Sequence, residues 1–175
     1  MKRKTVKNGL TRPEVATLAR LLGKMPPVPD IPPELFVSVM QKNVPVTIDL
    51  AIVRAGKLLL TYRRDAYFKG WHFPGSFMSP GETVAEAARR TALGETDLNI
   101  RNCRLLGVFN CVRNKRFHFV SFFLLCRANG APADGTWFSK RPRGLIPEHE
   151  RLWRNVETWL RSKNPDLPLA IGETK

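Results

Sequence analysis

The sequence lacks most of the features that mark membrane, secreted and zinc-binding proteins. No apolar run is long enough to cross a bilayer, and no apolar core of signal-peptide length follows the charged N-terminus. The three cysteines, Cys103, Cys111 and Cys126, have no metal-ligand spacing. We therefore expect a cytoplasmic protein with reduced thiols, no membrane contact and one domain, since 175 residues that are 43% hydrophobic can bury a core.

Acidic residues are scarce as well, with 15 Asp and Glu against 29 Lys and Arg, which gives a formal net charge of +14. The basic residues form separate clusters: Lys2, Arg3, Lys4 and Lys7; Arg113, Lys115 and Arg116; Lys140, Arg141 and Arg143. No helix-turn-helix, zinc-finger or RNA-binding sheet motif accompanies them. A solvated basic surface is therefore favoured over a nucleic-acid site, which stays the alternative.

Proline and charge patterns divide the chain into three parts. Residues 1–32 form a basic extension with a short helix and a Pro-rich connector, residues 33–163 form the main domain, and residues 164–175 form a loose tail. Residues 1–10 read as disordered. Helices are predicted over 12–23, 34–42, 83–95 and 147–161, and strands over 46–53, 57–62, 104–112 and 117–127.

The most informative stretch runs from Trp71 to Leu98, WHFPGSFMSPGETVAEAARRTALGETDL. It reads as a Gly-containing loop followed by a helix, on which positions 91, 94 and 95 share one face. Only Glu95 of these three is acidic. Since Mg²⁺ is usually bound by one or two carboxylates plus phosphate oxygens and water, Glu95 suits a metal that arrives with a diphosphate, and a Gly75 carbonyl could add a ligand.

This pattern resembles the Nudix box. The register runs Ser76, five residues, Glu82, seven residues, Arg90, and then Glu95, with Thr91 and Gly94 at two positions that are acidic in the family. The resemblance implies an α/β Nudix fold, a mixed β-sheet sandwiched between α-helices. It also implies that Glu82 and Arg90 support the loop and helix, while Glu95 and Gly75 bind Mg²⁺, with Mn²⁺ as the alternative ion.

Over residues 33–127 the chain looks like the GDP-mannose mannosyl hydrolases, whose box has the same two losses. That resemblance makes Asp49, Arg63 and His118 candidate catalytic residues, with His118 as the general base. Arg63, Phe77 and Arg116 are candidate substrate-binding residues, although Phe77 stands where the group has an arginine. A homodimer is also implied.

The implied reaction is Mg²⁺-dependent hydrolysis of a nucleoside diphosphate sugar, in which water activated by His118 attacks the anomeric carbon and the nucleoside diphosphate leaves. Two alternatives remain open. An ordinary Nudix pyrophosphatase would cut the diphosphate itself, but it needs acids from outside the box to replace those missing at 91 and 94. A catalytically inactive Nudix module that binds a nucleotide, RNA or a protein would account for Phe77, Ser76 and the +14 charge together.

Overall fold

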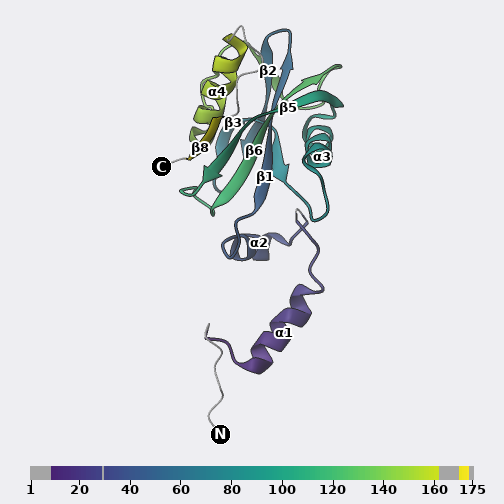
Figure 1. The fold of residues 1–175 in the computed structure, drawn as a ribbon, viewed down its shortest axis with the longest axis vertical. Coiled ribbons are helices and arrows are strands. Elements are labelled where there is room, and N and C mark those ends of the chain that lie inside the picture. The colour runs from purple at the N-terminus through teal and green to yellow at the C-terminus, as the bar shows by residue number, and fades with distance from the viewer. Residues whose placement is uncertain (1–8, 29, 162–169, 174–175) are drawn as a thin grey trace.

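The computed structural model describes residues 9–28, 30–161 and 170–173. One mixed β-sheet lies between α3 on one face and α4 on the other, with α2 at one end and α1 standing off the body (Figure 1). The helices are α1 (Arg12–Leu22), α2 (Pro33–Met40), α3 (Val84–Thr96), the 3-10 turn η1 (Pro147–His149) and α4 (Glu150–Arg161). The strands are β1 (Val46–Arg54), β2 (Lys57–Arg64), β3 (Lys69–His72), β4 (Gly75–Phe77), β5 (Ile100–Cys111), β6 (Phe119–Ala128), β7 (Thr136–Phe138) and β8 (Ala170–Glu173).

The centre of the sheet is β1, whose apolar run VTIDLAIV is buried on both faces. The strand order is β3-β2-β1-β6-β5-β8, with β4 paired to β1 and β7 paired to β2. The β1–β6 pair is parallel and the β1–β2 and β5–β6 pairs are antiparallel, so the sheet is mixed as predicted. Each face of the sheet has its own core, formed with Ala87, Ala88 and Ala92 of α3 or with Leu152, Trp153 and Val156 of α4.

Side chains at both ends fix the length of α3. At its start, Glu86 accepts hydrogen bonds from the Thr83 backbone and hydroxyl, and the Glu86 amide donates to the Thr83 hydroxyl oxygen, forming a capping box. At its end, Asp97 adopts the left-handed conformation at φ 56°, which Asp tolerates better than most residues. Glu95 therefore lies in the last turn of α3, beside the loop that contains Gly75.

The structure differs from the predicted elements in three places. Strands β3, β4 and β7 have three or four residues each, too short to give a periodic signal, and the sequence missed them. The closing helix starts as the 3-10 turn η1. Residues 170–173 of the expected loose tail form β8, which pairs in parallel with the open edge of β5, where unpaired backbone groups are available. The prediction for residues 1–10 lies mostly outside the described residues.

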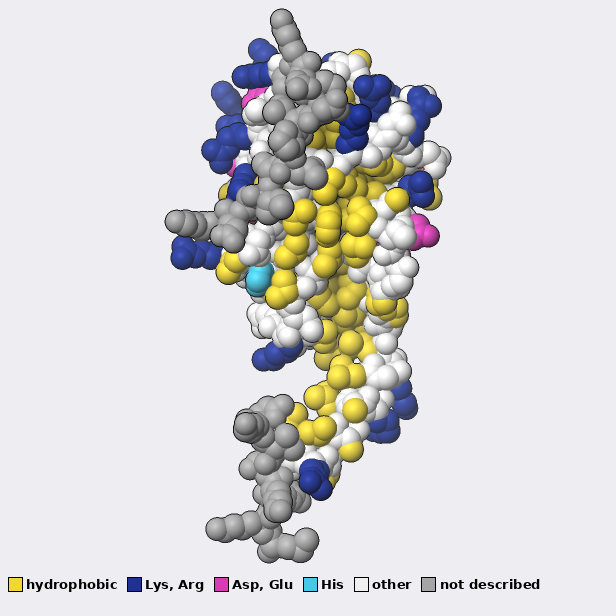
Figure 2. All heavy atoms as spheres, viewed as in Figure 1, with side chains coloured by type: hydrophobic (Ala, Val, Ile, Leu, Met, Phe, Trp, Pro, Cys, Tyr) yellow, Lys and Arg dark blue, Asp and Glu magenta, His cyan; other side chains and the backbone are white. Residues whose placement is uncertain are grey.

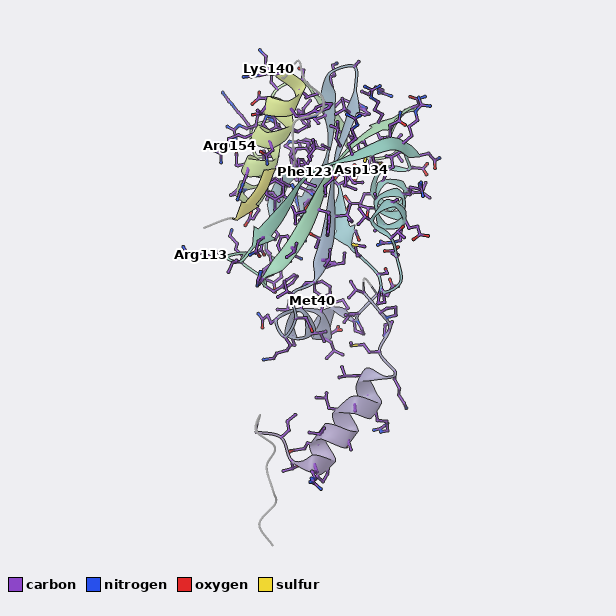
Figure 3. All side chains as sticks on the ribbon, viewed as in Figure 1. Met40, Arg113, Phe123, Asp134, Lys140 and Arg154 are labelled. Carbon is purple, nitrogen blue, oxygen red and sulfur yellow. The ribbon has the colours of Figure 1, made fainter. Side chains whose placement is uncertain are left out.

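The described part of the chain contains no helix long and apolar enough to cross a membrane. Helix α1 buries none of its residues. On the face drawn in Figure 2, Lys and Arg side chains lie around α4, along the upper end of the body and on α1, and they do not gather in one strip. Figure 3 likewise shows Lys140 and Arg154 projecting outward on the α4 side, whereas Phe123 lies over the centre of the sheet.

Candidate active site

A cavity of about 570 Å³ opens between β1, β4, the end of α3, the β5–β6 turn and η1. It brings together most of the residues that the sequence singled out: Asp49, Arg63, Gly75, Phe77, Glu95 and Arg116. The cavity is also lined by residues that the sequence did not assign to the site: His72, Arg113, Glu148, His149 and Arg151. Acids and arginines from separate parts of the chain thus face one space.

Asp49 is a buried carboxylate in the central strand. The Ser121 hydroxyl donates a hydrogen bond to Asp49 Oδ2. Burial raises the pKa of the Asp49 carboxyl to about 6, although the Ser121 hydrogen bond and the Arg63 charge oppose that rise. The carboxyl lies so close to Gly75 that a Cβ there would be 2.5 Å from Asp49 Oδ1, so the loop needs a glycine at this point.

Glu95 reaches the same cavity from the last turn of α3. Its Oε1 accepts a hydrogen bond from the Gly75 amide at 3.1 Å, and its Oε2 accepts one from the Thr61 hydroxyl at 3.3 Å. Burial raises the pKa of the Glu95 carboxyl to about 7, and the Asp49 charge adds to the rise. Two nearby carboxylates therefore share a partly dry site in which both ionised forms are disfavoured, the arrangement expected where a cation is to be bound.

Two half-buried histidines flank these acids. His72 Nε2 lies 3.0 Å from the Thr61 hydroxyl that donates to Glu95, so His72 can donate to that oxygen in turn. His149 Nδ1 accepts a hydrogen bond from the Phe73 amide at 2.9 Å, which leaves its single proton on Nε2, 3.8 Å from Asp49 Oδ1. Burial lowers the pKa of His72 to about 4 and that of His149 well below its usual value, so both rings are neutral near pH 7.

A long-range backbone contact carries Glu148 and His149 to the cavity. The Trp71 amide donates to the Gly144 carbonyl and the Ile146 amide donates to the Trp71 carbonyl, which binds the segment before η1 to β3. The two backbones approach so closely that a Cβ on Gly70 would lie 2.3 Å from the Gly144 oxygen. One oxygen of Glu148 is buried without a hydrogen-bond partner among the described residues.

Glu82 and Arg90 join the loop to α3. Arg90 Nε lies 2.5 Å from Glu82 Oε1 and Arg90 Nη2 lies 2.8 Å from Glu82 Oε2, a two-pronged ion pair. Arg90 Nη2 also donates to the Phe77 carbonyl at 2.7 Å, so one guanidinium fixes both ends of the loop. The hydrogen bonds from Arg90 hold the pKa of Glu82 at about 2.

The arginines line the wall away from α3. Arg63 pairs with Asp65 and lies over the Phe68 ring, and Arg116 lies over the same ring from the β5–β6 turn, with its guanidinium 5.3 Å from the ring centre. Burial and the charge of Arg63 lower the pKa of Arg116, and its Nε has no hydrogen-bond partner among the described residues. These charges are placed to receive an anion.

Two of the predicted site residues are placed differently from the expectation. His118 is not among the residues that line the cavity, and its Nε2 instead lies 2.5 Å from Asn110 Oδ1 across the hairpin. Phe77 does line the cavity but packs edge-on against Phe36, with ring centres 5.3 Å apart, and belongs to the small core under α2.

A metal ion would find a sparse set of ligands here. Among the residues the structure describes, no group of three or more His, Cys, Asp or Glu side chains is spaced to hold one. Thr91 is buried away from the cavity and Gly94 is exposed, so of the three helix positions only Glu95 reaches it. The donors fit a divalent ion that keeps several ligands from water and substrate phosphates, as Mg²⁺ does.

A model of the NUDIX domain matches residues 44–164, which includes every element that lines the cavity. The chain belongs to the Nudix family. An ADP-ribose pyrophosphatase from Methanocaldococcus jannaschii is 38% identical over 125 residues, covering 65% of this chain and 73% of that relative.

Solved structures show the same fold. A MutT NUDIX hydrolase from Burkholderia pseudomallei superposes with a TM-score of 0.60 at 24% identity, covering 65% of this chain and 98% of that chain. An ADP-ribose pyrophosphatase from Streptococcus suis superposes with a TM-score of 0.54 at 18% identity, covering 75% and 98% of the two chains. The predicted Nudix fold is confirmed. The relatives do not support the GDP-mannose mannosyl hydrolase branch, because the curated one bears the name of a pyrophosphatase.

Proposed function

We propose that this Nudix protein hydrolyses the diphosphate of a nucleoside diphosphate sugar, with ADP-ribose as the first substrate to test. The observation that supports this most is that carboxylates from three separate elements, Asp49, Glu95 and Glu148, line one cavity together with arginines. Two of these acids come from outside the box. In this proposal they take over the role of the acids that positions 91 and 94 lack. The 38% identity to an ADP-ribose pyrophosphatase favours the same chemistry.

In this mechanism the arginines bind and orient the diphosphate. Arg63 and Arg116 project from β2 and the β5–β6 turn into the same space, and their planar guanidinium groups suit phosphate oxygens. Glu95 and Asp49 would hold a divalent ion, which would neutralise charge on the phosphates during phosphoryl transfer. The Gly75 amide and the Thr61 hydroxyl orient Glu95, and the Ser121 hydroxyl orients Asp49.

Glu148 is the residue we assign to the attacking water. Its carboxylate lines the cavity and has one buried oxygen without a partner, so it can accept a proton from a water molecule placed between it and the phosphorus. His149 is a poor base because its Nδ1 already accepts the Phe73 amide. The bond between phosphorus and the bridging oxygen then breaks, giving a nucleoside monophosphate and a sugar phosphate.

The experiment is product analysis by phosphorus NMR. The purified protein is incubated with Mg²⁺ or Mn²⁺ and with ADP-ribose or GDP-mannose, beside the variants Glu95→Gln and His118→Asn. We expect AMP and ribose phosphate from ADP-ribose, strongly reduced turnover with Glu95→Gln and near-wild-type turnover with His118→Asn.

Two outcomes would contradict the proposal. Free sugar with intact nucleoside diphosphate, lost in His118→Asn, would restore carbon–oxygen cleavage with His118 as the base. No turnover of either substrate, together with metal-independent binding of nucleotide or RNA, would favour the inactive binding module. A salt-sensitive affinity for RNA would then connect the +14 charge to that role.

A further inference from the structure

Two of the three cysteines are neighbours on adjacent strands, far along β5 from the active-site cavity. Strands β5 and β6 pair regularly at Arg101 with Arg127 and again at Arg104 with Leu125, but the register shifts between these pairs. Two residues of β5 therefore face Cys126 of β6, and Cys103 is one of them. The Cys103 and Cys126 side chains hydrogen-bond to each other.

Facing positions on antiparallel strands come near the spacing that a disulfide requires. Facing residues of antiparallel strands have Cβ atoms roughly 4.5–5.5 Å apart, and a disulfide needs about 3.5–4.5 Å. The irregular pairing at this point, with the other β5 residue Asn102 in the left-handed conformation at φ 51°, removes the regular ladder that would resist a small shift. The two thiols can thus be joined without moving either strand far.

The two thiols differ in exposure and in acidity. Cys103 is exposed, whereas Cys126 is fully buried in the core under α3. The hydrogen bond from Cys126 lowers the pKa of the Cys103 thiol and the nearby Arg89 lowers it further, while the same hydrogen bond and burial raise the pKa of Cys126. The accessible thiol is therefore the one that more readily forms the nucleophilic thiolate.

A basic side chain of α3, Arg89, acts on the accessible thiol. The recess lined by Arg104, Arg127 and Trp159 is on the other face of the sheet, because Leu125 in its lining packs with α4 whereas Cys126 packs under α3. Because of the Arg89 charge, a small molecule that carries carboxylates suits the Cys103 thiol better than a cationic one.

We propose that Cys103 and Cys126 form a dithiol modification site that reacts with small anionic disulfides, Cys103 attacking and Cys126 resolving. The Cys103 thiolate attacks one sulfur of R–S–S–R, forming the mixed disulfide Cys103–S–S–R and releasing R–S⁻. Cys126 then loses its proton and attacks the Cys103 sulfur, forming the internal disulfide and releasing the second R–S⁻, which takes up the proton. The protein dithiol is oxidised and the reagent is reduced to two thiols. The proposal is independent of which bond the active site cleaves.

The test treats the full chain with glutathione disulfide, which has more carboxylate than ammonium groups. Remaining thiols are counted by reaction with a chromogenic reagent after unfolding, and intact mass and peptide maps locate the bonds. We expect the wild type to go from three thiols to one, with a Cys103–Cys126 peptide and no lasting adduct. The Cys126→Ser variant should instead stop at one glutathione adduct on Cys103, and Cys126→Ala repeats the test if the serine variant unfolds.

Cys111 provides the matched control. It lines the active-site cavity, and burial and the charge of Asp49 raise its pKa to about 12, so its thiolate is rare. Cys111→Ser should react like the wild type, and Cys103→Ser should form neither the adduct nor the internal bond. We expect Cys103 to be modified at least about tenfold faster than Cys111. Equal rates at the two residues, or a wild type that accumulates the mixed disulfide without the internal one, would overturn the proposal.

Discussion

The two sides of the active-site cavity reach the same space by different means. On one side, α3 and the Gly75 loop place Glu95 through contacts between residues close in the sequence, chiefly the Arg90–Glu82 pair and the Gly75 amide. On the other, η1 places Glu148 and His149 through pairing of β3 with a segment about seventy residues later. One side of the site is thus positioned by contacts between residues close in the sequence, and the other by contacts between distant residues. Only the first side is visible as a sequence motif.

The largest loss of activity should come from a change on the α3 side of the cavity, at Glu95. Glu95→Gln keeps the shape of the side chain but removes the charge that faces the cavity, so we expect kcat/KM for the proposed hydrolysis to fall about a hundredfold or more. Mg²⁺ affinity in the presence of a non-hydrolysable diphosphate, measured by calorimetry, should fall with it. Unchanged metal affinity in an inactive variant would assign Glu95 a role other than metal binding.

The long-range side can be disturbed without touching α3. In Gly70→Ala the new Cβ would lie 2.3 Å from the Gly144 oxygen, so the segment that leads to η1 must shift. Because displacing a catalytic group by about 1 Å can cost a hundredfold, we expect kcat/KM to fall about tenfold to a hundredfold. Gly94→Ala is the matched control, since a Cβ there meets nothing within 4 Å. Equal activity of the two variants would show that Glu148 and His149 keep their positions without the contact between β3 and the segment before η1.

The acidity of Glu95 gives a third, pH-dependent contrast. Its folded pKa of about 7 exceeds its ordinary value of 4.5, so the folded state holds a proton that the unfolded state releases between these pH values. The stability contributed by this group therefore falls as pH rises from about 4.5 through 7. In chelator, Glu95→Gln should be more stable than the wild type by about 3 kcal/mol at pH 8, with little difference near pH 4.5. Urea denaturation at both pH values measures this, and a pH-independent difference would refute it.

The smallest expected effect concerns the Arg90–Glu82 ion pair, which joins the loop to α3. Arg90→Lys keeps the charge but cannot make the two-pronged contact with Glu82 while also donating to the Phe77 carbonyl. We expect a loss of about 1 kcal/mol in the free energy of unfolding and a several-fold fall in kcat/KM. Thermal and urea denaturation measure the first and steady-state kinetics the second. A variant with wild-type activity would mean that the loop holds its shape without this arginine.

The sequence predicted well what depends on neighbouring residues. The helix over 83–95 carries its own capping box and apolar spacing, and α3 follows it within one residue at each end. The acid in an apolar strand, Asp49, signalled its special position because burying it has a cost. The Nudix resemblance then supplied the order of the elements around them.

The sequence failed where position depends on distant backbone contacts. Glu148 and His149 sit in the run PEHE, which gives no period and no motif until β3 is known to pair with the segment before it. His118 was predicted to be the general base because the resemblance places it where the GDP-mannose mannosyl hydrolases carry theirs, yet it bonds to Asn110 on the neighbouring strand outside the cavity. In a two-stranded hairpin, the direction of one side chain depends on the turn and register, which sequence spacing alone does not determine.

The central claim is that water attacks phosphorus in this cavity. It is tested most directly by running the reaction in ¹⁸O-labelled water, with Mg²⁺ and the substrate that the product panel identifies, and locating the label by mass spectrometry. We expect the label in a phosphate of one of the two monophosphate products. Free sugar together with a nucleoside diphosphate that carries no label in either phosphate would contradict the account.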